Sequence, residues 1–532
     1  MKWSFLDIDA TETEKKYHTG PLSAKLIQAS HLDDSHIQEL LSQDENLKTS
    51  QAVCVQKACA RIMEAKKKNE KIFVGGDYDA DGVCSTAIMK ETLDVLGIGN
   101  GYYIPDRFRE GYGLSAKTVA MAHEKGYSVI MTVDNGVKAH EALKTAKSLG
   151  MDVIVTDHHV IEEEVEADIL VHPDYMEDDF QYFSGAGVAL EISRNLIGNN
   201  DHLTALAAVA AIGDAMPLWK ETRKLVRKGI SLLKQGKPSC LALLLRPGSS
   251  VDETSIAFQI VPKLNAVGRM NTLANVNTLP QYLLLKDSQR NAILHYREQL
   301  NQVNETRKRL SGKESDRAEA MITDEDMEIL YDPDFHEGIC GLVAGKIASK
   351  IHKPTLVMAK SGDLIKGSGR SVPGFNLFEF FSSFEEPVAF GGHEMAVGLS
   401  LRAEDFDSFR AHVQEEMKKS SFVYEEQPEK AIVIHEGDIT FDNIADLQTL
   451  CPYPKEMVPA LFVMRNPVVL SCKDTPKTIR YQISAGRSSF DATVLKQKHL
   501  PETDRPQWIC GSLSINRFRG RVSLQMMVED LA

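Results

Sequence analysis

The chain has 532 residues, of which 43% are apolar and 26% are charged, which argues against a disordered or collagen-like chain and predicts several folded domains. The formal net charge of −14 argues against a surface that is basic throughout, but it leaves room for a local basic channel, because a phosphate backbone responds to the local field. No apolar run is long enough to span a bilayer, the N-terminus has no long apolar core, and the eight cysteines lack any metal-binding spacing, so we expect a cytoplasmic protein without a membrane anchor.

Between residues 71 and 173, short runs rich in valine and isoleucine alternate with helical stretches. The runs are KIFVGG, SVIMTVDNG, DVIVTDHH and ADILVHP, and the first two helical stretches end near Gly97 and Gly126, as C-terminal caps favour. Strand and helix repeated in this order predict right-handed crossovers and a parallel sheet that is covered on both faces.

Acidic or imidazole side chains follow each of the first three runs. They are Asp77, Asp79 and Asp81 after the first run, Asp134 after the second, and Asp157, His158 and His159 after the third. Because the carboxyl ends of parallel strands meet at one edge of a sheet, we expect these side chains to converge in one crevice. Asp214, which follows a helix of small residues, could reach the same place.

Carboxylates combined with one or two imidazoles suit Mn²⁺ or Mg²⁺, and the lack of thiolates argues against a structural zinc site. Five of these aspartates, those at 77, 79, 81, 134 and 214, and the two histidines exceed what one ion needs, so the pattern predicts two divalent ions that share a bridging carboxylate and act on a phosphoryl group. The alternative for any one of these acids is a helix cap or a turn.

Later segments predict further domains. One amphipathic helix is expected at about 290 to 320, where it bridges to a second lobe. The second lobe mixes strands and helices, and an acidic linker, VYEEQPEK, precedes a region rich in strand signals that predicts a small β-barrel. The expected fold class is α/β with a C-terminal β-barrel, and the expected domains are residues 1–285, a connecting helix at 286–325, a second lobe at 326–420 and the barrel at 430–532.

Several of these motifs carry a resemblance to a known family. GDYDADG, TVDNG, TDHH and GDAMPL resemble the four motifs of the DHH phosphoesterase superfamily. More narrowly, YIPDRFREGYGL, VPKLNAVGRMN, GSGRSVPGFNL and GGHEMAVG are similar to motifs of the RecJ family of single-stranded-DNA-specific exonucleases. The resemblance runs from about residue 20 to about residue 400, and it implies a DHH domain, a smaller domain with the GGH motif, and an oligonucleotide-binding barrel.

The resemblance also implies an activity. A metal-dependent exonuclease that degrades single-stranded DNA from the 5′ end to mononucleotides, in recombination and repair, is expected. The expected partners are single-stranded DNA, a single-strand-binding protein and a helicase, and the expected state is a cytoplasmic monomer. Two alternatives stay open: a DHH-family phosphodiesterase that acts on short RNA or cyclic dinucleotides, and a non-catalytic RecJ-like scaffold.

Site residues follow from the matched motifs. The resemblance assigns the two ions to Asp77, Asp79, Asp81, Asp134, His158 and Asp214, with Asp134 as the bridge, and it places His159 at the scissile phosphate. The nucleophile would be a metal-activated water. For phosphate binding it implies Arg107, Arg269, Ser368 and Arg370, of which Ser368 and Arg370 resemble part of a pocket for the 5′ end of DNA.

Other polar residues keep two interpretations each. His393 faces the nucleotide or supports a glycine turn, and Asn265 binds a phosphate or caps a turn. The basic segment at 223–234 tracks a DNA backbone or is a solvated helix face. Arg517, Phe518 and Arg519 form a DNA-binding hairpin or an exposed hairpin with protective charges.

Overall fold

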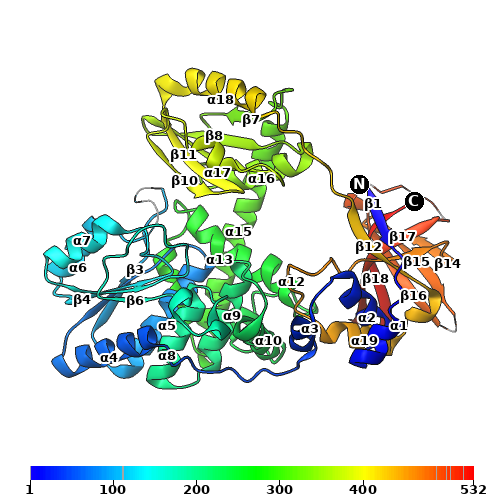
Figure 1. The fold of residues 1–532 in the computed structure, drawn as a ribbon, viewed down its shortest axis with the longest axis horizontal. Helices are drawn as coiled ribbons and strands as arrows, with labels where there is room; N and C mark the ends of the chain where they lie inside the picture. The colour runs from blue at the N-terminus through cyan, green and yellow to red at the C-terminus, as the bar shows by residue number, and fades with distance from the viewer. Residues whose placement is uncertain are drawn as a thin grey trace.

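The structure, a computed structural model, describes residues 2–108, 110, 113–486, 488–498, 500–501, 503, 505–518 and 521–532. Figure 1 shows three bodies, each built around one β-sheet: a first domain at the lower left, a second domain above it, and a C-terminal domain at the right. In the part of the chain so described, no helix combines the length and the apolar character needed to cross a bilayer.

The first domain contains a parallel sheet in the order β3-β2-β4-β5-β6. Its strands are β2 (Ile72–Gly75), β3 (Asn100–Tyr103), β4 (Val129–Val133), β5 (Asp152–Thr156) and β6 (Ile169–Val171). Three helices, α4 (Val53–Lys68), α5 (Ala80–Leu96) and α8 (Gly185–Ile197), share one core with the sheet, while α6 (Ala116–Glu124) and α7 (His140–Ser148) share another. Along β2, Ile72 and Val74 belong to the first core and Phe73 to the second. The predicted sheet with two covered faces is therefore confirmed.

Helices continue this domain and then leave it. They are α9 (Asp201–Gly213), α10 (Lys220–Lys234), α11 (Ser239–Ala242), α12 (Glu253–Ser255), a π-helical turn (Ile256–Ile260), α13 (Val261–Arg269) and α14 (Leu279–Leu283). The 30-residue helix α15 (Arg290–Glu319) then rises to the second domain (Figure 1). Its apolar stripe, including Ile293, Leu300 and Val303, is buried, so the stripe packs against the adjoining domains.

The second domain has a five-stranded sheet in the order β10-β11-β9-β8-β7. The strands are β7 (Glu328–Tyr331), β8 (Thr355–Ser361), β9 (Leu364–Arg370), β10 (Ala389–His393) and β11 (Ala396–Arg402). Only β7 and β8 pair in parallel, and the other neighbours are antiparallel. Helix α16 (Cys340–Ile351) covers one face, whereas α17 (Leu377–Phe381) and α18 (Phe406–Ser420) cover the other.

The C-terminal domain has an eight-stranded mixed sheet in the order β1-β12-β13-β17-β18-β16-β15-β14. The strands are β1 (Trp3–Leu6), β12 (Glu429–Ile434), β13 (Phe462–Arg465), β14 (Val469–Asp474), β15 (Thr478–Ala485), β16 (Ser488–Leu495), β17 (Trp508–Phe518) and β18 (Arg521–Leu531). Helices α1 (Thr11–Tyr17), α2 (Pro21–Ala29), α3 (Asp34–Leu41) and α19 (Phe441–Thr449) accompany them.

The N-terminal segment belongs to this C-terminal domain. Strand β1 pairs in parallel with β12, and Leu22, Leu26 and Leu40 share one apolar core with Ile432 and Phe462. The domain boundaries expected from the sequence grouped these N-terminal residues with the first domain, at 1–285. A strand whose partner lies more than 400 residues away carries no local signal of that partner, so the sequence pattern could not place it.

Helix α10 joins the domains. The Arg223 side chain is buried and donates hydrogen bonds to the backbone oxygens of Leu40 (3.0 Å), Leu450 (2.9 Å) and Pro452 (2.6 Å). Arg227 donates to the backbone oxygens of residues 449 and 451. The basic segment at 223–234 was expected either to track DNA or to be solvated, and both interpretations are wrong for these two arginines, because their donors are used between the domains.

Replacing Arg223 with methionine is therefore expected to destabilise the protein by about 3 kcal/mol or more, since three buried carbonyl groups lose a charged donor. The urea midpoint of the full-length chain measures this effect. Lys228→Met, on the same helix, is the matched control and should change the midpoint little. Equal midpoints for the Arg223 variant and the control would contradict a role of Arg223 in joining the domains.

Candidate active site

The predicted metal ligands lie at the carboxyl ends of three adjacent strands. Strand β2 ends at Gly75 just before Asp77, Asp79 and Asp81, strand β4 ends just before Asp134, and strand β5 ends just before residues 157–159. Asp214 directly follows helix α9. The structure thus brings the whole set to one edge of the sheet, as parallel topology predicts.

The set divides into three overlapping groups that could hold a metal ion. The groups are Asp77, Asp79 and Asp134; Asp81, His158 and Asp214; and Asp134, His158 and His159. Within each group, one potential ligand atom per residue lies within 4.8 Å of the others. Asp134 belongs to the first group, and its Oδ1 atom lies 3.2 Å from Nε2 of His158, a member of the second group. A carboxylate between two possible ion sites is what a bridge requires.

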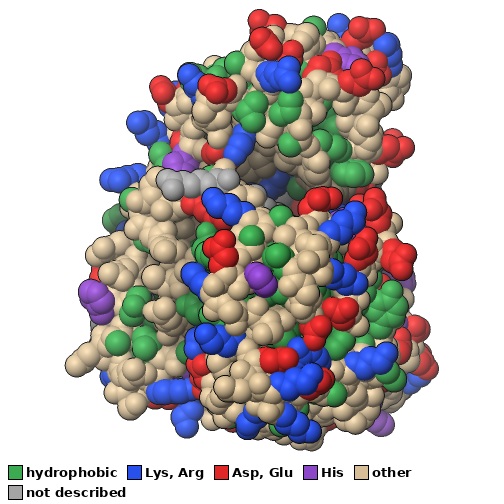
Figure 2. Space-filling model, turned by 90° about the vertical axis from the view of Figure 1, so that its left-hand side faces the viewer, with side chains coloured by type: hydrophobic (Ala, Val, Ile, Leu, Met, Phe, Trp, Pro, Cys, Tyr) green, Lys and Arg blue, Asp and Glu red, His purple; other side chains and the backbone are tan. Residues whose placement is uncertain are grey.

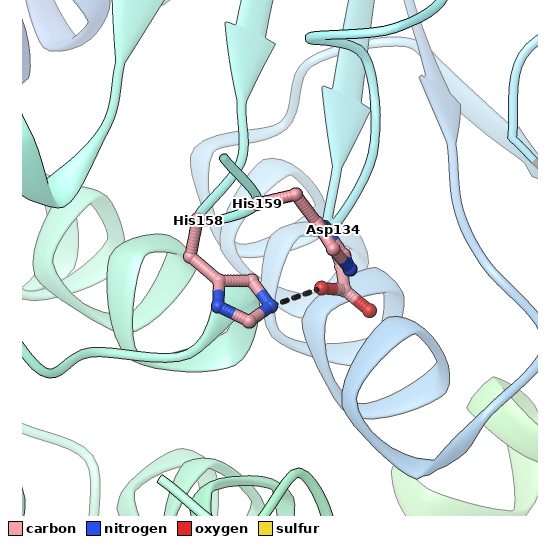
Figure 3. Close-up of side chains that lie close together, drawn as sticks. All are labelled: Asp134, His158 and His159. Carbon is pink, nitrogen blue, oxygen red and sulfur yellow. Dashed lines mark ion pairs between the residues drawn. The ribbon is translucent and has the colours of Figure 1, made fainter. Parts of the chain in front are cut away.

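His158 occupies the centre of the second group. Its Nε2 atom lies 3.2 Å from Asp134 Oδ1, 3.5 Å from Asp214 Oδ2 and 3.6 Å from Asp81 Oδ2. Figure 3 shows the imidazole of His158 pointing toward the carboxylate of Asp134 from the neighbouring strand end. Burial lowers the pKa of His158 in spite of the nearby acids, so the ring is neutral and fit to ligate a metal.

The carboxylates are destabilised as long as no cation neutralises them. Burial and the charge of Asp79 raise the pKa of Asp77 well above its usual range, and burial with the charge of Asp81 raises the pKa of Asp214 to about 7. The Oδ1 atom of Asp77 is buried and accepts no hydrogen bond from the described residues. A donor set of carboxylate oxygens and imidazole nitrogens, which includes a buried carboxylate oxygen without a hydrogen bond, fits Mn²⁺ or Mg²⁺.

Backbone amides hold two of the acids in place. Asp79 caps helix α5 by accepting from the amides of Asp81 (2.9 Å) and Gly82 (3.0 Å). Asp81 accepts from Ser184 Oγ (2.9 Å) and from the amides of Gly185 (2.7 Å) and Ala186 (2.8 Å), at the start of α8. The predicted metal-binding interpretation and the capping alternative are therefore compatible, since a carboxylate has lone pairs for both.

Asp134 depends on a close approach of α8. Its φ of 60° lies in the left-handed region, which is uncommon for any residue other than glycine. A Cβ atom on Gly185 would lie 2.5 Å from Asp134 Cβ, so only glycine permits this contact. Neither Ser184 nor Gly185 was among the predicted site residues, although the small residues SGAG at a helix start were the available signal.

Asp157 positions His159. Its Oδ1 atom accepts from the His159 amide (3.1 Å) and lies 2.8 Å from His159 Nδ1, and its Oδ2 atom accepts from the Val137 amide (3.0 Å). Burial alone would lower the pKa of His159, but the hydrogen bond and charge of Asp157 outweigh it and raise that pKa to about 8. His159 is therefore a cation at neutral pH. No role was predicted for Asp157 from the sequence, because its hydrogen bonds depend on the conformation of the turn.

Arginines from both domains gather beside the metal-ligand groups. Burial, together with the charges of Arg107 and Arg370, lowers the pKa of Arg269 to about 10, which still leaves it charged at neutral pH. The guanidinium of Arg107 lies over the ring of Tyr78, 5.1 Å from its centroid. Tyr78 stands between Asp77 and Asp79 in the sequence. Within the described part of the chain, Arg107, Arg269 and Arg370 form no ion pair with a carboxylate, so their charges remain available for an anion.

The second domain adds the start of helix α16 to this cluster. A Cβ atom on Gly341, in the first turn of α16, would lie 2.8 Å from Ser368 Oγ and 2.9 Å from Arg370 Nη2. Arg370 Nη1 donates to Ser368 Oγ at 3.2 Å. A helix N-terminus beside a hydroxyl and a guanidinium favours a phosphate. Figure 2 shows the molecule hollowed between the first and second domains, with lysine and arginine side chains along the hollow.

Of the remaining predicted residues, Asn265 contacts the segment that carries the metal ligands. The side-chain oxygen of Asn265 accepts from the Ala80 amide at 2.7 Å, so the structure supports its capping role at the start of α5. His393 ends β10, is exposed, and receives a long contact from the Met395 amide at 3.3 Å. Arg517 is exposed on β17, the backbone of Phe518 pairs with Arg521, and Arg519 lies outside the described residues.

Comparisons with known families match all three domains. Residues 71–213 match the model of the DHH family, N-terminal domain, residues 324–419 match the DHHA1 domain, and residues 432–530 match the RecJ OB domain. The chain is 31% identical to the single-stranded-DNA-specific exonuclease RecJ of Bacillus subtilis, over 100% of this chain and 71% of that protein. It is 33% identical to the Escherichia coli protein of the same name, over 67% of this chain and 68% of that protein.

Solved structures agree with this result. A crystal structure of RecJ in complex with Mn²⁺ from Thermus thermophilus superimposes with a TM-score of 0.82 at 24% identity, covering 100% of this chain and 79% of that chain. A crystal structure of exonuclease RecJ bound to manganese has a TM-score of 0.61 at 29% identity, covering 71% of this chain and 96% of that chain. The first of these supports the arrangement of all three domains.

Proposed function

The chain belongs to the RecJ family of single-stranded-DNA-specific exonucleases, and from this premise we propose that it hydrolyses single-stranded DNA from the 5′ end and releases mononucleotides, with two Mn²⁺ or Mg²⁺ ions. The observation that carries the proposal is the position of Asp134 between Asp77 and Asp79 on one side and His158 on the other, beside arginines that have no acidic partner among the described residues. Such ions would supply an activated water and stabilise charge on the phosphoryl oxygens.

The chain's own residues then take distinct roles in this proposal. Asp77 and Asp79 would hold one ion, Asp81, His158 and Asp214 the other, and Asp134 both. His159, held as a cation by Asp157, would donate a hydrogen bond to the scissile phosphate. Arg269 and Arg370 with Ser368 would bind the terminal 5′-phosphate, and a strand held by its end is cut from that end.

A time course with Mn²⁺ on 3′-labelled substrates tests the function. The substrates are a 5′-phosphorylated single strand of DNA, its blunt duplex, a matching RNA and a dinucleotide, each with an EDTA control. Stepwise shortening of the single DNA strand alone, stopped by EDTA, is the expected result. Hydrolysis of the dinucleotide alone would favour the small-substrate alternative, and binding without any hydrolysis would favour the scaffold.

The charge of His159 predicts how activity depends on pH. A histidine whose pKa is raised to about 8 keeps its proton at pH 7 and loses it as the pH rises through 8, so activity should fall above that value. In Asp157→Asn the amide carries no charge to stabilise the protonated imidazole. The alkaline limb of the activity profile should therefore shift down by about one pH unit. The pH profile of kcat/KM in Mn²⁺ measures this shift, and identical limbs for the two proteins would contradict the role of Asp157.

Further partners remain predictions. A single-strand-binding protein and a helicase are expected from the family resemblance, and a monomeric state and a cytoplasmic location belong to the same proposal. The OB domain match at residues 432–530 supports binding of single-stranded DNA by the C-terminal domain.

A further inference from the structure

Phe258 is a large aromatic residue that the fold leaves in water. Its exposed fraction is 76%, although its neighbours Ile256 and Ile260 in the same π-helical turn are fully buried. Exposing a phenylalanine forfeits about 2 kcal/mol of burial free energy, and π-helical turns often occur at functional sites. The turn also directly precedes α13, the helix that carries Asn265 and Arg269 to the active site.

The ring of Phe258 lines a groove between the first and C-terminal domains. The groove has a volume of about 740 Å³. Phe258 and Gln259 line one wall, and Ser512, Ser514 and Met527 line the other. Ser512 and Met527 are cross-strand neighbours on β17 and β18, so this wall is a face of the sheet in the OB domain. In Figure 1, α12, which directly precedes the π-helical turn, lies on the side of the first domain that faces the C-terminal domain.

The charges of the groove indicate which part of a DNA strand it could contact. Among the described residues that line it there is no lysine, arginine or histidine. Three of its four acids already bind groups of the chain: Asp252 accepts from the Ser255 amide (2.7 Å), Glu253 from the Tyr453 amide (3.3 Å), and Glu529 pairs with Lys498. Such a wall does not attract phosphates, whereas it offers an aromatic ring, hydroxyls and an amide to a nucleobase.

We propose that Phe258 stacks on a nucleobase of the single-stranded substrate, in a groove that contacts bases while the phosphates face solvent. This inference rests on the proposed function. Phe258 precedes Arg269 by eleven residues of helix, which is about 16 Å and corresponds to about five stacked nucleotides at 3.4 Å each. The stacked base is therefore a few nucleotides from the 5′ end, beyond the reach of a dinucleotide.

Substitution of Phe258 separates this role from folding, because the exposed ring leaves no cavity. In Phe258→Ala, affinity for a 5′-phosphorylated 20-mer, measured in EDTA to prevent hydrolysis, should fall about tenfold. The kcat for hydrolysis of the same 20-mer in Mn²⁺ at saturating DNA should be unchanged, and Phe258→Trp should restore the affinity. Tyr175→Ala, which removes another exposed aromatic ring (56% exposed), is the matched control and should leave both measurements unchanged.

A double-mutant cycle, which combines the Phe258 substitution with the loss of single bases from the DNA, identifies the contact itself. An abasic site is placed at each of positions 3 to 7 of the 20-mer in turn. At one position the abasic site should weaken binding by the wild-type protein about tenfold. At that same position it should not weaken binding by Phe258→Ala, because the stacking contact is already lost. The ratio of the wild-type affinity to the Phe258→Ala affinity for the intact 20-mer should also be the same at 50 and 200 mM salt, since stacking releases no counterions.

The outcomes distinguish the two proposals. If the wild-type protein degrades no single-stranded DNA, the proposed function itself fails. If it degrades DNA but Phe258→Ala binds the 20-mer as tightly as wild type, or if the abasic effects add to the substitution at every position, the stacking role is wrong. A groove with acidic residues would then be a site for a basic peptide instead.

Discussion

Replacing Asp134 with asparagine should abolish hydrolysis of single-stranded DNA while the protein stays folded and still binds the strand. The carboxylate is grouped with Asp77 and Asp79 and lies 3.2 Å from His158 of the other proposed site, so its loss weakens both ion sites at once. Stabilisation by the ions contributes several kcal/mol to the transition state, and each 1.36 kcal/mol is tenfold in rate. The expected loss in kcat/KM is therefore about a thousandfold or more, measured on a 3′-labelled single strand in Mn²⁺.

The same variant should be more stable than the wild-type protein when no metal is present. Burial and the charges of Asp81, Asp79 and Asp77 raise the pKa of Asp134 well above its ordinary value of 3.8. A carboxyl group whose pKa folding raises opposes folding once it ionises, so the folded state loses stability as the pH rises above 3.8. Asparagine cannot ionise, and it removes this loss.

Thermal unfolding at pH 8 measures the effect of the substitution on stability, once in EDTA and once in Mn²⁺. The variant should have the higher Tm in EDTA, and the wild-type protein should gain more from Mn²⁺, by about 2.7 kcal/mol at a hundred times its Kd. Asp94→Asn, which removes an acid that pairs with Lys90 within α5, is the control and should follow the wild type. Retained turnover in Asp134→Asn would refute the bridging role.

The sequence predicts the first domain well because its signals are local. The run VIMTV at 129–133 has no polar face, as a strand covered on both sides requires, and the helical stretches between such runs indicate a parallel sheet whose strand ends meet by topology. The position of β1 shows the opposite case. Trp3–Leu6 joins a sheet through a pairing with Glu429–Ile432, and no short-range pattern reports a partner so distant.

The site follows the same division. Acids and imidazoles at strand ends are visible in the sequence, and the structure brings them together. The residues that position them are not visible, because their roles depend on tertiary contacts. Gly185 is needed because α8 lies so close to Asp134 that a Cβ atom at position 185 would be 2.5 Å from Asp134 Cβ. In the sequence Arg223 looks like a surface cation, whereas in the fold it donates hydrogen bonds to three carbonyl groups from distant segments.

Arg370→Gln should remove the preference for a 5′-phosphorylated end. Among the described residues, the guanidinium donates hydrogen bonds to Ser368 Oγ and to the backbone oxygen of Gly369, and it pairs with no carboxylate of the second domain. Burial and the charge of Arg107 lower its pKa, and a dianionic phosphate would relieve this repulsion. A hydrogen bond between charged groups contributes about 1.5–3 kcal/mol, so the rate ratio between 5′-phosphate and 5′-hydroxyl strands should fall by about ten- to a hundredfold.

The ratio of two ends within one protein cancels any general loss of activity, which makes it specific for recognition of the terminus. Arg410→Gln removes an arginine of the same domain that pairs with Glu325, and it should leave the ratio unchanged. If Arg370→Gln slowed both substrates equally, the arginine would act on the scissile phosphate or on domain closure, and the 5′ polarity would have to come from elsewhere. A preserved metal-dependent rate on the 5′-hydroxyl strand, with the ratio lost, is the outcome that places the strand end between Ser368, Arg370 and the start of α16.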